Sequence, residues 1–148
     1  MPNICEKGIL GRLYLVDFNY YELYETHLSS IKYFKRSNFP LPDAIDKIIQ
    51  QLIKNEYLIR VKTKYGKHVS NRIIPLVQSD LTELKASEKD VIDHVLFQTS
   101  NWSLSHLESY LQDDMPIKIS KENEMIDYEF ALYREAPYSV RNYESDMI

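Results

Sequence analysis

The residue types that most often perform chemistry are few in this chain and far apart. Four histidines and one cysteine are present, and no two of them stand at the spacing of a metal site or a nucleophile with its base. The sequence contains no glycine-rich phosphate loop and no Gly-x-Ser-x-Gly elbow. The adjacent carboxylates Asp113 and Asp114 are more typical of a loop or a helix end than of acid–base catalysis. We therefore expect a protein that is not an enzyme and that has no metal or cofactor.

A carboxylate within a tyrosine-rich apolar segment is the most informative feature. Between Arg12 and Glu25, aromatic and aliphatic residues recur at helical spacing on two neighbouring faces, and Asp17 lies among them. Burying even a neutral polar group without a partner costs on the order of 2–7 kcal/mol, so Asp17 must be paired or hydrogen-bonded. Because no catalytic partner accompanies it, we predict that Asp17 is structural.

Tyrosine content favours a binding function. The chain has 12 tyrosines in 148 residues, and tyrosine is enriched at protein interfaces because it combines a rigid apolar ring with a polar tip. Tyr14 and Tyr21 are expected in the core. For Tyr20, Tyr24 and Tyr33, both a core role and contact with a partner stay open.

Charge is divided unevenly along the chain. The net charge is −4, but residues 1–78 carry 12 basic and 7 acidic residues, whereas residues 79–148 carry 6 and 15. Such a division suits an anionic partner on one side and a basic partner on the other, with Asp113 and Asp114 as candidate contacts for the latter. The simpler alternative is that both faces are solvated.

Hydrophobic periodicity and turn residues predict the elements that would position these side chains. Phe39–Pro42 should interrupt regular structure, with Pro42 suited to the first turn of the next helix. Capping patterns at Ser87–Asp90 and Ser105–Glu108 should open two further helices, and Pro116 should end that region. The expected elements are a helix over 7–26, a strand or extended segment over 28–36, a helix over 43–55, a hairpin of 57–62 with 69–76, helices from 87 and from 105 to 111, and a segment over 125–134 that fits a strand or a helix.

This order predicts a single α+β domain over residues 1–148, mainly helical with a small β-hairpin and with a polar linker near 79–86. Residues 43–76 have the outline of a winged helix, in which Lys62, Lys64 and Lys67 could contact phosphate groups. The helix itself offers few side chains for reading bases. No apolar run approaches the length of a membrane span and no export signal is evident. We therefore expect a cytoplasmic protein.

Three segments in one order resemble a known family. They are Arg12–Glu22, the Ser30–Lys35 segment followed by Phe39–Pro42, and Ile126–Arg134 followed by Pro137–Val140. Together they are similar to the Panacea domain of SocA-like antitoxins. The chain has Phe39, Gln112 and Ile117 where that family usually has glycine, histidine and tryptophan. The matching motif residues are Asp17, Tyr20, Tyr21, Tyr33, Lys35, Pro40, Tyr128, Tyr133 and Arg134.

The resemblance implies a non-catalytic antitoxin, often encoded on a prophage, that binds its cognate protein toxin directly. It also implies a mainly helical fold with a β-hairpin. Because the family repeats its motifs together, Lys35 or the backbone amides after Asn38 are the expected neighbours of Asp17. Two alternatives stay open: a winged-helix DNA-binding regulator, and an adaptor that hands a bound partner to a protease.

Overall fold

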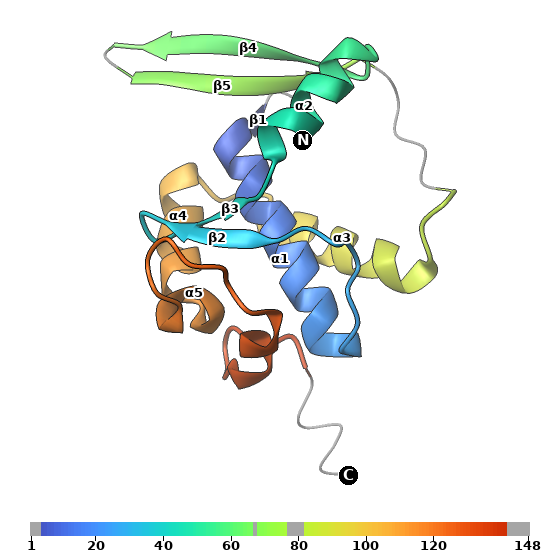
Figure 1. The fold of residues 1–148 in the computed structure, drawn as a ribbon, viewed down its shortest axis with the longest axis vertical. Coiled ribbons are helices and arrows are strands. Elements are labelled where there is room, and N and C mark those ends of the chain that lie inside the picture. The colour runs from blue at the N-terminus through green and yellow to red at the C-terminus, as the bar shows by residue number, and fades with distance from the viewer. Residues whose placement is uncertain (1–3, 67, 77–81, 142–148) are drawn as a thin grey trace.

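Helix α1 (Glu6–Tyr24) runs through the middle of the molecule, and most other elements pack against it (Figure 1). The structure is a computed structural model that describes residues 4–66, 68–76 and 82–141. Residues over nearly the whole circumference of α1 are buried, as its apolar composition predicts. The helix ends where Glu25 adopts φ 54° and donates its N–H to the Tyr21 carbonyl at 2.7 Å.

The fold is α+β and mainly helical, in agreement with the sequence prediction. A three-stranded antiparallel sheet has the strand order β1-β5-β4, and a separate hairpin joins β2 to β3. Among the described residues, no helix has both the length and the hydropathy that crossing a bilayer requires. The remaining elements are β1 (Ile4–Cys5), β2 (Tyr33–Arg36), β3 (Phe39–Pro42), α2 (Ile45–Lys54), β4 (Leu58–Tyr65), β5 (His68–Pro75), α3 (Ala86–Gln98), α4 (Leu104–Asp113), α5 (Met115–Ile119) and the 3₁₀ helix η1 (Tyr128–Tyr133).

The prediction that Phe39–Pro42 interrupts regular structure is wrong, because this segment is strand β3. Ser37 and Asn38 form a two-residue turn with positive φ at both positions, so the flanking pair Arg36–Phe39 exchanges backbone hydrogen bonds. Pro40 and Pro42 then stand at alternate positions, where the backbone nitrogen points away from β2. A proline at such a position removes no bond from the hairpin.

Helix starts also differ from the predicted capping patterns. Helix α2 begins only at Ile45, after Ala44 at φ 56°, so Pro42 is not in its first turn. Helix α3 begins at Ala86, one residue before the predicted box, and its N-cap is Lys85, whose N–H donates to the Glu88 carboxylate at 2.9 Å. Helix α4 is capped by Ser103, whose hydroxyl oxygen accepts the His106 N–H at 3.1 Å, rather than by Ser105.

Two ambiguous segments are resolved by the tertiary structure. Pro116 does not end the helical region; it lies in the first turn of α5, where no intrahelical donor is needed. Residues 125–134 are neither a strand nor an α-helix. Met125 makes an isolated bridge with Phe34, and η1 follows. Of the predicted linker near 79–86, residues 79–81 lie outside the described residues, and 82–85 form a turn that leads into α3.

The core lies between α1 and the helices that cover it. Leu107 and Leu111 on α4, Val95 on α3 and Ile117 on α5 are completely buried against it. Gly11 permits this close approach, because a Cβ atom there would lie 2.9 Å from side-chain carbons of both Leu107 and Leu111. The α1–α4 contact therefore depends on a residue without a side chain.

We predict that Leu107→Ala lowers the free energy of unfolding by about 2–5 kcal/mol, because it opens a cavity between α1 and α4. Urea denaturation followed by circular dichroism measures the change. The control is Phe97→Ala, since Phe97 is 83% exposed on α3 and should shift the value by no more than about 0.5 kcal/mol. Equal effects of the two variants would contradict this description of the core.

Candidate functional site

Asp17 is completely buried at the centre of α1 and is hydrogen-bonded by two hydroxyl groups. The Ser29 hydroxyl donates to one carboxylate oxygen at 2.8 Å, and the Tyr33 hydroxyl donates to the other. The expected neighbours of Asp17 are wrong. Lys35 instead donates a hydrogen bond from its ammonium group to the Ser120 carbonyl at 2.9 Å, and Phe39, the first residue after Asn38, is paired with Arg36 in the hairpin. Strand β2 crosses α1 (Figure 1), so Tyr33 lies beside Asp17. The turn at Ser37 and Asn38 lies at the far end of the hairpin, away from Asp17.

The environment of Asp17 favours a structural role. Burial raises the pKa of Asp17, and the hydrogen bonds from Tyr33 and Ser29 offset part of this rise. Burial, and then the nearby carboxylate, raise the pKa of the Tyr33 phenol, so Tyr33 keeps its proton and remains a donor. The pair holds the tyrosine ring edge-on to Phe18, which stacks in turn on Tyr128 with ring centroids 4.3 Å apart.

Arg134 is the centre of a second buried polar cluster, here called the Arg134 cluster: Tyr14, Asn19, Glu22, Asp114 and Arg134. Its guanidinium binds both carboxylate oxygens of Asp114, at 2.6 and 2.9 Å, and also reaches Glu22 at 3.2 Å and Asn19 at 2.8 Å. Tyr14 donates its hydroxyl to Asp114 at 2.8 Å. The cluster therefore connects α1, the α4–α5 junction and the end of η1.

The two carboxylates of the Arg134 cluster are balanced by Arg134 and by Arg141, whose guanidinium lies 3.0 Å from the Glu22 carboxylate. Burial alone would lower the pKa of Arg134, but the paired Asp114, with a smaller contribution from Glu22, more than reverses this effect, so the net shift is upward and the group stays cationic. Burial and the neighbouring Asp114 raise the pKa of Tyr14, which therefore stays a neutral donor. Such a two-oxygen pairing is strong when both partners are desolvated together. The arrangement indicates a structural role, in which the cluster holds α1, the α4–α5 junction and the end of η1 together.

We predict that Arg134→Met lowers the free energy of unfolding by about 3–5 kcal/mol, because it leaves Asp114 buried without a counter-charge and leaves Glu22 with Arg141 alone. Urea denaturation at neutral pH measures the loss. Lys121→Met removes an exposed cation as the matched control. A loss for Arg134→Met as small as that of the control would show that the cluster does not stabilise the fold.

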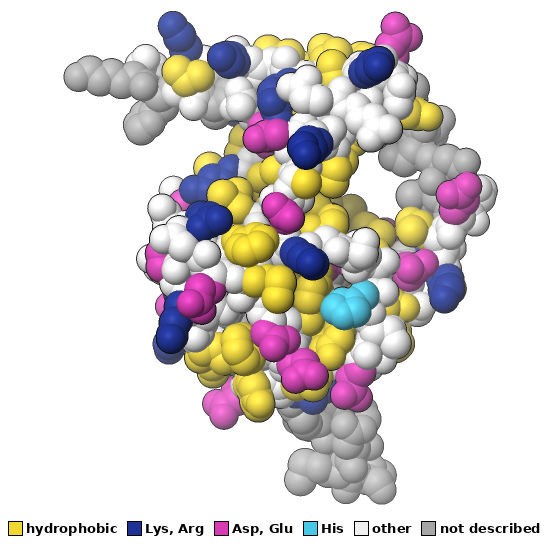
Figure 2. Space-filling model, viewed as in Figure 1, with side chains coloured by type: hydrophobic (Ala, Val, Ile, Leu, Met, Phe, Trp, Pro, Cys, Tyr) yellow, Lys and Arg dark blue, Asp and Glu magenta, His cyan; other side chains and the backbone are white. Residues whose placement is uncertain are grey.

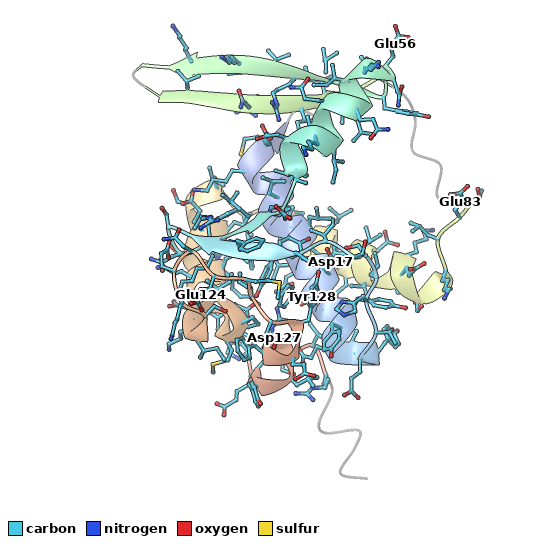
Figure 3. The ribbon with its side chains drawn as sticks, viewed as in Figure 1. Asp17, Glu56, Glu83, Glu124, Asp127 and Tyr128 are labelled. Atoms are coloured by element: carbon cyan, nitrogen blue, oxygen red, sulfur yellow. The ribbon has the colours of Figure 1, made fainter. Side chains whose placement is uncertain are left out.

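A surface groove lies beside the Asp17 pair, where the end of α1, residues 27–32 and residues 125–129 meet. It encloses about 450 Å³ and is lined mainly by apolar groups of Tyr21, Ile31, Met125 and Tyr128. Figure 3 shows Asp17, Tyr128 and Asp127 in this part of the molecule, and Figure 2 shows hydrophobic side chains gathered there among charged ones. The Tyr128 hydroxyl donates to the Ile31 carbonyl at 2.7 Å, which holds the two walls together.

The structure separates the tyrosines and carboxylates that the sequence nominated for partner contact. Tyr20, Tyr33 and Asp114 are buried, so their side chains serve the interior. Tyr24 is 46% exposed and Asp113 is exposed, which leaves both accessible to a partner.

Other nominated residues are spread over the molecule. Lys62 and Lys64 are exposed on β4, whereas Lys67 lies outside the described residues. Pro40 is buried within β3 and Tyr133 is 63% exposed on η1. No group of three or more His, Cys, Asp or Glu side chains suited to a metal occurs among the described residues.

Sequence reasoning missed Glu22 and Met125 as site residues. Glu22 was part of a recognised motif, yet its role depends on Arg134, which lies 112 positions away. Met125 carries no motif signal, since only the Phe34–Met125 bridge brings it to the groove. Tyr128, by contrast, was named as a motif residue, because it lies in the third motif block.

A family model described as the SocA-like antitoxin, Panacea domain matches residues 12–116. The chain belongs to this family. No curated protein and no solved structure matches it. The matched span contains Asp17, Tyr33 and Asp114, whereas Tyr128 and Arg134 lie beyond its end. The Arg134 cluster of this Panacea domain therefore joins the span that the family model matches to the C-terminal segment, whereas the Asp17 pair lies within that span.

We predict that the raised pKa of Asp17 makes the fold less stable as pH rises from about 4, the ordinary carboxyl value, through the higher folded-state pKa. The folded state binds the proton more tightly than the unfolded state, so its stabilising effect is present at low pH and is lost above the folded pKa. Asp17→Asn should remove this dependence, whereas Asp113→Asn, on an exposed residue, should leave it intact.

Asp17→Ala should cost about 1–3 kcal/mol, because it leaves the buried Tyr33 hydroxyl without its acceptor. Asp17→Asn should cost less, since an amide oxygen can still accept one hydroxyl. Thermal denaturation between pH 3 and 8 provides both comparisons. A stable Asp17→Ala variant that lost only partner binding would place Asp17 in the interface instead.

Proposed function

We propose that this chain is a cytoplasmic antitoxin that neutralises a cognate protein toxin by binding it directly. Membership of the SocA-like antitoxin family supports this function and carries the proposal. The buried clusters also support it, because their ionisable groups are paired with one another and face the interior. We further propose that the toxin is encoded by an adjacent gene, as on a prophage.

The groove beside Tyr128 is the best candidate for toxin contact on the body of the molecule. Its apolar lining can receive a hydrophobic side chain, and its rim carries Lys32, Asp127 and Glu129. Exposed Glu122 and Glu124 lie near the same C-terminal segment. These acidic residues around the groove would favour a basic toxin surface, because complementary charges speed the encounter of two proteins.

Co-expression with the product of the adjacent gene tests the antitoxin function. The wild-type chain should restore growth to cells that this product arrests, and the two proteins should co-purify. If the adjacent product is not toxic, or if the chain never relieves its toxicity, the antitoxin proposal fails.

The groove has its own test in the same assay. Met125→Glu places a charge at the groove on a side chain that is already 52% exposed, so folding should be preserved while growth rescue falls. Phe97→Glu makes the same kind of change on α3 and should rescue like the wild type. Full rescue by Met125→Glu, with unfolding matched to the wild type, would exclude the groove as the contact.

A DNA-binding regulator is the second candidate. The observation that favours it is the packing of α2 beside β4 in a sheet ordered β1-β5-β4, with Lys62 and Lys64 exposed on the hairpin. A gel shift with the gene's own promoter at increasing salt should show binding that weakens steeply, if lysine–phosphate contacts carry it. Binding that persists after Lys62, Lys64 and Lys67 are replaced with alanine would exclude the wing.

A further inference from the structure

Strand β4 presents a long, unpaired edge. Among the described residues it is the outer strand of the β1-β5-β4 sheet, and it pairs there over all eight of its residues with β5 only. Figure 1 shows that the β4–β5 hairpin projects beyond the helical body and that α2 lies beside only one end of it. An exposed edge of this kind is a ready template for another extended chain.

The backbone register shows which groups face outward. The Leu76 N–H donates to the Tyr57 carbonyl at 3.0 Å, and the hairpin pairs Tyr65 with His68 across a two-residue loop. Antiparallel pairing alternates, so the odd-numbered residues of β4 bond to β5 and the even-numbered residues point their N–H and C=O groups away. Arg60, Lys62 and Lys64 therefore offer backbone donors and acceptors along the open edge.

Side chains along this edge alternate between apolar and cationic. Ile59 and Val61 are each 38% exposed on one face of the strand. Arg60, Lys62 and Lys64 lie on the opposite face by the two-residue period of a strand. Arg60 is held by Glu6 at 2.8 Å, whereas the side chains of Lys62 and Lys64 are exposed.

The charge pattern selects among the possible occupants. A second copy of the chain, pairing antiparallel through β4, would bring the lysines of one copy opposite those of the other, which is unfavourable. A nucleic acid would use the lysines but leave Ile59 and Val61 and the outward amides unmatched. An added strand that alternates apolar residues with Asp or Glu matches all three features.

We propose that the toxin binds by adding an extended segment, in which apolar residues alternate with Asp or Glu, to the open edge of β4. This proposal rests on the proposed antitoxin function and names a contact separate from the groove. Main-chain hydrogen bonds to Arg60, Lys62 and Lys64 hold the added strand. Its carboxylates face Lys62 and Lys64, and its apolar side chains cover Ile59 and Val61.

Lys62→Pro is the decisive variant, because proline removes the outward N–H without removing a bond to β5. Lys62→Ala keeps that N–H and is the matched control. The joint replacement of Lys62 and Lys64 by Glu reverses the charge. Each variant is first compared with the wild type by urea denaturation, so that only variants of unchanged stability enter the binding assays. If Lys62→Pro is unstable, N-methylation of the Lys62 amide by chemical synthesis replaces it.

Two assays then use the full chain. In the first, affinity for the purified product of the adjacent gene is measured by calorimetry. Lys62→Pro and the charge reversal should each weaken binding by about tenfold, and Lys62→Ala by less, because one backbone bond or one pair of charge contacts is lost. In the second, the probe is a synthetic octapeptide of alternating Val and Glu. It should protect the amides of Arg60, Lys62 and Lys64 from hydrogen exchange, whereas a Val–Lys peptide should not.

The outcomes separate this proposal from the proposed function. Rescue and tight binding that are unchanged in Lys62→Pro and in the charge reversal would overturn the edge proposal and leave the antitoxin function standing. Absence of toxin binding by the wild type, with the Val–Glu peptide still protecting the edge, would overturn the antitoxin function and with it the toxin as occupant, and would leave an edge that binds an alternating acidic strand. A concentration-dependent dimer through β4, or DNA binding lost on removal of the lysines, would show another occupant and overturn the proposal.

Discussion

The fold depends on the buried ion pairs of Arg134. Its guanidinium binds Asp114 and Glu22 at once, and Arg141 binds Glu22 as well, so three chain segments that are distant in sequence must come together before all of these charges are compensated. The penalty for burying such charges singly is several kcal/mol per ion. The Arg134 cluster therefore makes partly folded arrangements unfavourable in free energy, and it holds the C-terminal segment against α1.

Asp17 acts in a similar way at the middle of α1. Its two hydroxyl partners come from the segment after α1 and from β2, so the carboxylate anchors the crossing of the β2–β3 hairpin. The crossing places Tyr33 and Phe18 beneath Tyr128, and Tyr128 forms a wall of the groove. The surface that we assign to toxin contact is therefore shaped by a buried polar pair.

The two proposed contacts suit different features of a partner. The groove is lined mainly by apolar groups and has acidic residues around it, whereas the β4 edge is extended and cationic. A partner that bound both surfaces would present basic groups to the acidic surroundings of the groove and acidic groups to the cationic β4 edge. Such a division favours a specific partner over self-association, because the lysines on β4 repel a second β4 edge.

The sequence alone determined those elements that are encoded by residues close together in the chain. The apolar period of α1 and the alternation around Gly66 predicted a central helix and the β4–β5 hairpin, and the motif blocks indicated the family. Tertiary structure alone decided that Phe39–Pro42 is a strand, that Asp17 binds Ser29 and Tyr33, and that Asp114 is internal. The physical reason is that a buried polar group is satisfied by whichever partner the packing brings within hydrogen-bond distance. The Tyr14–Asp114 contact spans 100 positions, and no local pattern encodes a separation of that kind.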